Sequence, residues 1–247
     1  MDELLAPCGI VPAAGAGLRL RPFEYPKELL PVAYAPDGDG VRPVLAIELA
    51  LKHLADGGCA GAVVAIGDHK LELVRLLRSG ASLGLPLAYV HQAEPRGLTD
   101  AVLSCTPWAG ERPCVLVMPD TWFTPGDVVV QLLAQLEAGA DLALAVFPTE
   151  HARDLGPVEH DGDGRVRAVH DKPDGPAPGN TWGVAAWRST FTRFLEAWAG
   201  DDQRATPIGF AFHAAIQAGL DVRAVPFPDG CYQDLGAPKS LAELVLG

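Results

Sequence analysis

The chain has 247 residues, which is enough for one large α/β domain or for two small domains. Hydrophobic residues make up 49% of it and charged residues 20%, so it can bury a sizeable core without a metal ion or disulfide bonds. The formal net charge of −12 argues against a protein that binds nucleic acid or anionic lipid, although a few cations gathered in one cleft can still hold a small anionic substrate.

Short apolar runs alternate with helical patterns along most of the chain. The runs are rich in Val, Leu, Ile and Ala without strict alternation, as in strands covered on both faces, and they occupy residues 9–13, 62–66, 87–91, 115–118 and 142–147. Apolar residues at helical spacing are Val129, Leu132, Leu133 and Leu136, and later Phe191, Phe194, Leu195 and Trp198. This alternation predicts an α/β fold in three layers, with helices on both faces of a mostly parallel sheet.

Turn signals become frequent in the second half of the chain. Asp-Gly-Asp-Gly at 161–164 and Asp-Gly-Pro at 174–176 separate short strand-like pieces, which predicts a mixed or antiparallel extension of the same sheet. An earlier insertion, Ala-Pro-Asp-Gly-Asp-Gly at 35–40, predicts a hairpin. Because no linker-like segment divides the chain, we expect a single domain over residues 1–247 with two lobes, 1–125 and 126–247.

A glycine-containing loop follows the first predicted strand. Two glycines, Gly15 and Gly17, are followed by the cations Arg19, Arg21 and Lys27 among prolines. Glycines after a strand let backbone N–H groups approach a phosphate or a base. A dinucleotide-binding fingerprint would need a third glycine and a P-loop would need Gly-Lys-Ser/Thr, so neither fits. A tight turn with solvated cations remains open, but three clustered cations in a chain with only five lysines favour an anion site.

Polar residues also follow two later strands. Gln92, with Gly97 and Leu98 shortly after it, follows the strand at 87–91, and Asp120 follows the strand at 115–118. If these strands are parallel, their carboxyl ends share one edge with the glycine loop, where ligands of open α/β sheets bind. A lone Asp at a strand end is more often a turn or helix-cap residue. Its neighbours here favour a Mg²⁺ ligand acting together with substrate phosphates.

The cysteines and the N-terminus indicate the compartment. The five cysteines are odd in number and widely spaced, which favours small buried side chains in a reducing environment, and no Cys or His spacing indicates zinc. Asp2 and Glu3 stand where a signal peptide needs basic residues, and no apolar run is long enough to span a bilayer. We therefore expect a cytoplasmic protein with no membrane or nucleic-acid partner.

Six short segments, in order along nearly the whole chain, carry most of these groups. The first is Gly15-x-Gly17-x-Arg19 followed by Pro26-Lys27-x-Leu29-Leu30-Pro31-Val32. The other five are Gln92 with Gly97-Leu98, Met118-Pro119-Asp120, Gly156 with Val158-Glu159, Asp171-Lys172-Pro173, and Tyr232-Gln233-Asp234-Leu235-Gly236. The ordered set resembles the signature of the sugar-1-phosphate nucleotidylyltransferases (nucleotide-sugar pyrophosphorylases), which include thymidylyl- and uridylyltransferases of glucose-1-phosphate.

The resemblance implies a fold and a reaction. The fold would be the Rossmann-like, GT-A-type nucleotidyltransferase fold, with nucleotide bound by lobe 1–125 and sugar phosphate by lobe 126–247. A phosphate oxygen of a sugar-1-phosphate would attack the α-phosphorus of a nucleoside triphosphate, UTP or dTTP being favoured, and pyrophosphate would leave. Such transfers depend on positioning and charge neutralisation.

The resemblance also implies roles for individual residues. Nucleotide contacts would come from Ala13, Ala14, Gly15, Gly17, Gln92, Gly97 and Leu98. Arg19 would hold the leaving phosphates, Lys27 would balance charge at the α-phosphate, and Lys172 would fix the sugar phosphate. Gly156 and Asp171 would lie near the sugar hydroxyls, and Asp120 and Asp234 would hold Mg²⁺.

The chain departs from the family pattern at three points, and the last of them leaves the acceptor open. Leu18 replaces the usual threonine, Asp171 is one methylene shorter than the usual glutamate, and the family's Glu-x-x-x-Thr-Asp stretch has no clear counterpart in the apolar segment 205–213. A modified sugar, a cyclitol phosphate or another alcohol phosphate could replace glucose-1-phosphate. A cytidylyl- or guanylyltransferase, a catalytically weak nucleotide-sugar sensor, and a homo-oligomer also stay open.

Overall fold

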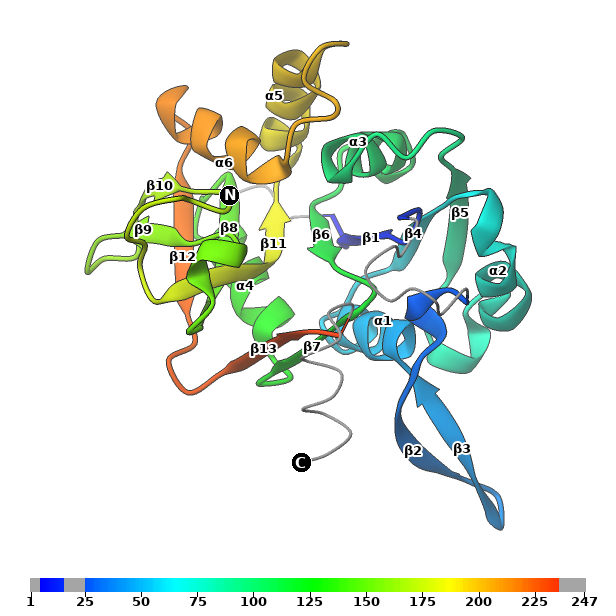
Figure 1. Cartoon of the computed structure of the whole chain (residues 1–247). Coiled ribbons are helices and arrows are strands. Elements are labelled where there is room, and N and C mark those ends of the chain that lie inside the picture. Colours follow the sequence, from blue (N-terminus) through cyan, green and yellow to red (C-terminus); the bar gives the residue numbers. More distant parts are fainter. Residues whose placement is uncertain (1–4, 16–24, 236–247) are drawn as a thin grey trace.

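The computed structural model describes residues 5–15 and 25–235, and a seven-stranded sheet runs through the middle of this part (Figure 1). The strand order is β12-β8-β11-β6-β1-β4-β5. Only β11 runs antiparallel to its neighbours, β6 and β8, whereas the other adjacent pairs are parallel. The strands are β1 (Cys8–Pro12), β4 (Gly61–Ile66), β5 (Leu87–His91), β6 (Cys114–Val117), β8 (Leu142–Pro148), β11 (Asn180–Trp187) and β12 (Val222–Pro226).

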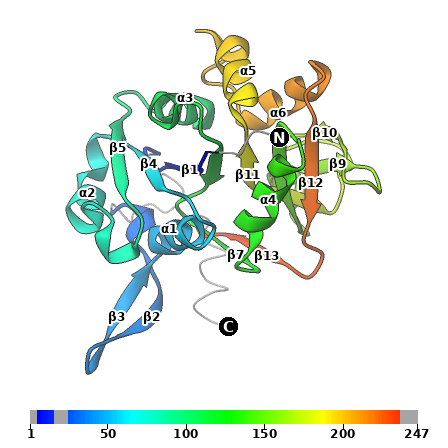
Figure 2. The same ribbon diagram turned by 180° about the vertical axis from the view of Figure 1, so that it is seen from behind.

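Helices cover both faces of this sheet (Figures 1 and 2). One face packs against α1 (Ala46–Asp56), α2 (Leu71–Leu77) and α4 (Val128–Glu137), and the other against α3 (Leu98–Ala109), α5 (Ser189–Ala199) and α6 (Ile208–Gln217). Successive strand residues therefore enter opposite cores: Ile10 belongs to the α3 side and Val11 to the α1 side, and neither is exposed. The predicted three-layer α/β fold with a mostly parallel sheet is confirmed.

The predicted elements agree closely with those of the structure. Each of the five predicted strands is present with its ends within one residue of the expected position. The two helical patterns lie in α4 and α5, where Leu132 and Phe191 are fully buried. The expected hairpin is present but longer than the insertion, because β2 (Pro31–Asp37) and β3 (Gly40–Leu45) both extend it away from the body of the molecule (Figure 1).

The predicted extension of the main sheet by the second half of the chain is confirmed only in part. β11 does join the main sheet in the antiparallel sense, but β9 (Val158–His160) and β10 (Val166–Val169) form a separate two-stranded sheet. The Asp161 carboxylate accepts hydrogen bonds from the backbone N–H groups of Asp163 and Arg165, at 3.1 and 2.9 Å. These bonds close a tight turn, so the two short strands pair with each other.

A second small sheet brings two distant segments together. β7 (Thr121–Thr124) pairs antiparallel with β13 (Cys231–Asp234), and the register sets Asp234 opposite Thr121. The backbone N–H of Leu235 donates to the carbonyl of Asp120 at 2.8 Å. The far end of the described chain is thereby fixed beside the end of β6.

The burial of the thiols agrees with the sequence analysis. All five cysteines are free, and four of them are buried, as expected of small apolar side chains, while Cys231 is half-buried. Among the described residues, no helix combines the length and the apolar character needed to cross a membrane.

Phe147→Ala tests how the main sheet supports the small one. The Phe147 ring is fully buried and stacks on Phe227 and Tyr232, with ring centroids 5.4 and 5.5 Å apart. We expect urea denaturation to show a loss of about 3–5 kcal/mol in the free energy of unfolding, because the ring leaves a cavity. The control Phe210→Ala removes a ring that is 48% exposed and should change stability by about 0.5 kcal/mol or less. Equal losses in the two variants would contradict this role.

Candidate active site

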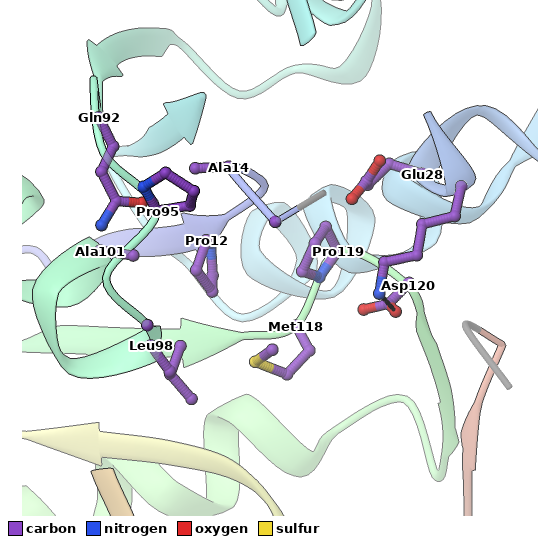
Figure 3. Close-up of a pocket in the computed structure, with 13 residues that line it drawn as sticks. Pro12, Ala14, Glu28, Gln92, Pro95, Leu98, Ala101, Met118, Pro119 and Asp120 are labelled. Atoms are coloured by element: carbon purple, nitrogen blue, oxygen red, sulfur yellow. Dashed lines mark hydrogen bonds and ion pairs between the residues drawn. The ribbon is translucent and has the colours of Figure 1, made fainter. Parts of the chain in front are cut away.

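A cavity of about 400 Å³ opens at the carboxyl ends of β1, β5 and β6 (Figure 3). The residues that line it come from the loops after these strands, from the first turns of α3, and from the 3₁₀ turn Lys27–Leu29. They are Pro12, Ala14, Gly15, Lys27, Glu28, Gln92, Pro95, Gly97, Leu98, Ala101, Met118, Pro119 and Asp120. Parallel strands have therefore gathered distant loops at one edge of the sheet, as the sequence indicated.

Most of the candidate nucleotide contacts line this cavity. Ala14, Gly15, Gln92, Gly97 and Leu98 all do. Figure 3 shows Gln92 and Asp120 at opposite sides of it, with Pro12 and Ala14 between them.

One other candidate, Ala13, lies elsewhere, and two others cannot be placed. Ala13 is fully buried in the core on the α1 side, and its N–H donates to the carbonyl of Ala65 at 2.8 Å, so it holds the strand rather than lining the cavity. Gly17 and Arg19 lie outside the described residues.

An ion pair joins Lys27 and Asp120 at one side of the cavity. The Lys27 ammonium donates to Asp120 Oδ2, while the side chains are 15% and 5% exposed. Lys27 begins the 3₁₀ turn, in which the N–H of Leu29 donates to the carbonyl of the buried Pro26 at 2.9 Å. Asp120 is fixed by its position directly before β7. A cation and a carboxylate thus meet where three strand-end loops converge.

The pairing of β7 with β13 brings the two candidate metal-binding residues together: Asp234 lies opposite Thr121, and the N–H of Leu235 donates to the carbonyl of Asp120. Burial, together with the negative charges of Asp234 and Asp120, raises the pKa of the Tyr232 hydroxyl. Within the described ranges no three His, Cys, Asp or Glu side chains cluster as a metal site. Two carboxylates nevertheless fit Mg²⁺, which usually takes one or two of them and completes its octahedron with water and substrate phosphates.

A buried ion pair that sequence reasoning missed lies behind Lys27. Glu28 accepts a hydrogen bond from the ammonium of Lys70 at 2.5 Å, and both side chains are only 1% exposed. Lys70 ends the short 3₁₀ helix Asp68–Lys70, which follows β4 closely. Because an unpaired charge is very costly inside a protein, this pair ties the Lys27 turn to the central sheet.

Gln92 belongs to a chain of polar contacts that was also missed. Its Nε2 donates to Asp100 Oδ2 at 2.6 Å, and Arg204 Nε donates to Asp100 Oδ1 at 2.5 Å. Burial raises the pKa of Asp100, but hydrogen bonds from Gln92 and Arg204 and the charges of Arg204 and Arg96 outweigh it, so the pKa lies below its ordinary value. Nothing in the sequence spacing indicates this contact, because Arg204 lies 104 residues after Asp100.

The candidate sugar-phosphate residues form a separate group beside β9 and β11. The N–H of Lys172 donates to the carbonyl of Leu155 at 2.9 Å, and Lys172 takes a φ of +46° with an exposed side chain. A Cβ on Gly156 would lie 2.2 Å from Trp182 Nε1, so close packing already requires glycine there. Asp171 is half-buried. These three residues lie near one another, but none of them lines the 400 Å³ cavity.

Removing the buried partner of Glu28 should destabilise the protein. In Lys70→Met the carboxylate stays buried without its partner, so we expect the free energy of unfolding to fall by about 3–5 kcal/mol in urea denaturation. The control Lys52→Met removes the exposed pair with Asp56 and should cost about 0.5 kcal/mol. A second change, Glu28→Leu, in the Lys70→Met background should restore most of the loss. A double variant as unstable as the single one would show that charge pairing is not the cause.

The chain is similar to known proteins along almost its whole length. The family model described as nucleotidyl transferase matches residues 8–246. The chain is 27% identical to a glucose-1-phosphate thymidylyltransferase of Streptomyces antibioticus over 95% of its own length, but it spans only 64% of that relative. It is 30% identical to the UTP–glucose-1-phosphate uridylyltransferase AglF of Haloferax volcanii, covering 95% of this chain and 93% of the relative.

Solved structures share the fold. A UDP-glucose pyrophosphorylase complexed with UDP-glucose superposes with a TM-score of 0.79 at 20% identity, over 97% of each chain. A UTP-bound UGPase from Acinetobacter baumannii superposes with a TM-score of 0.75 at 18% identity, over 98% of this chain and 93% of the other. With the family model covering almost the whole sequence, the chain belongs to the nucleotidyl transferase family.

Proposed function

We propose that the chain transfers a nucleotidyl group from a nucleoside triphosphate, with UTP or dTTP favoured, to a sugar-1-phosphate, giving an NDP-sugar and pyrophosphate. The observation that carries this proposal is that one cavity has Gln92 at one side and the Lys27–Asp120 pair at the other. The Gln92 amide can form hydrogen bonds with the edge of a base, and Lys27 can bind a phosphate. The presence of both groups in one cavity suits a nucleotide. The thymidylyl- and uridylyltransferases among the relatives support the same reaction class.

The residues act mainly through position and charge. The nucleotide would lie along Ala14 and Gly15 with its base between Gln92 and Gly97-Leu98. A phosphate oxygen of the acceptor attacks the α-phosphorus in line, the bond to the β-phosphate oxygen breaks, and that oxygen leaves with the electron pair as pyrophosphate. Lys27 exchanges its contact with Asp120 for one with the α-phosphate, where negative charge grows. Arg19 holds the leaving phosphates through its planar guanidinium.

Asp120 and Asp234 would hold a Mg²⁺ ion. When bound, the ion supplies positive charge that screens the phosphate oxygens from the attacking group. Asp120 keeps its position through the pairing of β7 with β13, which also carries Asp234. Asp120 pairs with Lys27 in the structure and would exchange this partner for the metal ion when nucleotide binds.

The acceptor would bind in lobe 126–247, with Lys172 on its phosphate and with Asp171 and Gly156 near the hydroxyl groups. The exposed Lys172 side chain, on a backbone fixed by Leu155, supports this assignment. Lobe 1–125 would bind the nucleotide. The proposed location is the cytoplasm, because five free thiols agree with a reducing compartment.

Substitution of either member of the Lys27–Asp120 pair should slow the reaction of the folded protein. Asp120→Asn and Lys27→Ala should each lower pyrophosphate release from UTP or dTTP plus glucose-1-phosphate by roughly 10²–10³-fold, because each removes a charge at the reacting phosphate. Lys52→Ala, on the exposed surface of α1, should keep the wild-type rate. Wild-type rates in both site variants would contradict the mechanism.

A panel of substrates tests the proposed reaction itself. UTP, dTTP, CTP, GTP and ATP are each mixed with glucose-1-phosphate, other sugar-1-phosphates or a cyclitol phosphate, and pyrophosphate is measured. The proposal predicts release with at least one sugar-1-phosphate and UTP or dTTP, and release that stops when EDTA removes divalent cations. Nucleotide binding without release across the whole panel would contradict it and would favour a sensor.

A further inference from the structure

Among the residues that the structure describes, the side-chain amide of Gln92 has a hydrogen-bond partner at its NH₂ end only. Gln92 follows β5 directly, its N–H donates to the carbonyl of Ile66 at 2.8 Å, and the residue is 6% exposed. Nε2 donates to Asp100 Oδ2 at 2.6 Å. Asp100 lies in the first turn of α3 with its side chain 3% exposed, so the contact is shielded from water. The orientation of the amide is therefore set inside the protein, before any ligand binds.

Chemistry allows only one orientation of this amide. An ionised carboxylate accepts hydrogen bonds and cannot donate them, so it can face only the NH₂ end of Gln92. Asp100 is kept ionised by Arg204 at 2.5 Å and by Arg96 at 3.8 Å. The other end, Oε1, is then the end left for a ligand, and Gln92 lines the cavity.

The residue that holds Asp100 in place, Arg204, comes from the other half of the chain. Arg204 lies in the turn between α5 and α6, and the Thr99 hydroxyl donates to the carbonyl of Thr206 at 2.5 Å in the same place. A Cβ on Gly97, which has a φ of +126°, would lie 3.4 Å from the carbonyl oxygen of Ala205. The turn between α5 and α6 thus packs against the first turn of α3 through three contacts.

We propose that Asp100, anchored by Arg204, is a positioning residue that turns the oxygen of the Gln92 amide toward the cavity, so that the site takes a base with an imino N–H and disfavours cytosine. This inference rests on the proposed function, in which Gln92 contacts the base. Uracil and thymine present an N3–H donor to such an oxygen. Cytosine presents a bare N3 acceptor there, and two facing acceptors repel each other.

Asp100→Asn reverses the orientation in a defined way. Arg204 Nε can only donate, so it holds the oxygen of the new side chain on its own side. The NH₂ group then faces Gln92 and requires the Gln92 oxygen to turn toward it. The Gln92 NH₂ group would face the cavity, where it suits the N3 acceptor of cytosine.

Equilibrium binding of UTP, CTP and N3-methyl-UTP, measured by calorimetry with Mg²⁺ present, tests the inference. The wild-type protein should prefer UTP to both others by roughly tenfold or more, because each of the others loses the imino donor. In Asp100→Asn the ratio of CTP to UTP affinity should rise by roughly tenfold or more. The control Asp127→Asn, at an exposed position before α4, should keep the wild-type ratio.

Two results would overturn the inference: equal wild-type affinity for UTP and N3-methyl-UTP, or an unchanged CTP to UTP ratio in an Asp100→Asn protein with wild-type circular dichroism. The wild-type comparison needs no substitution, so it can overturn the inference even if Asp100→Asn does not fold. Absence of pyrophosphate release alone would contradict the proposed function and leave this binding test standing, whereas failure to bind any of the three nucleotides would overturn both.

Discussion

The ion pair between Lys27 and Asp120 is the interaction on which the proposed chemistry depends. Its two members lie 93 residues apart, one on a 3₁₀ turn after β1 and one at the end of β6. In a largely buried setting each charge is costly unless it is paired. The pair therefore holds an ammonium group and a carboxylate in place at the cavity, where an incoming phosphate needs a cation and Mg²⁺ needs a carboxylate.

Much of the surrounding structure holds this pair in position. The buried Glu28–Lys70 pair ties the Lys27 turn to the loop after β4, and the β7–β13 sheet fixes Asp120 beside Asp234. At the other side of the cavity, the Gln92, Asp100 and Arg204 contacts join the two halves of the chain. Preorganised groups of this kind act on a reacting phosphate without having to rearrange first.

The sequence predicted the elements whose signals are local. Apolar runs located the central strands within one residue, and the loops after β1, β5 and β6 met at one edge because the strands are parallel. The contacts that the sequence analysis missed join residues that are far apart in the chain and belong to no motif. Neither Lys70 with Glu28 nor Arg204 with Asp100 has a local pattern, and the four-residue strands β7 and β13 are too short for periodicity to show. The side chain of Ala13 lies in the core on the α1 side, and its contact with the nucleotide stays a prediction.

The most direct test of the account is a crystal structure of the chain with a non-hydrolysable UTP analogue and Mn²⁺, whose anomalous signal locates the ion. The account predicts the base against Gln92, the α-phosphate within reach of Lys27, and an anomalous peak at Asp120 and Asp234. A nucleotide bound outside the 400 Å³ cavity, or an ion that contacts neither aspartate, would contradict it.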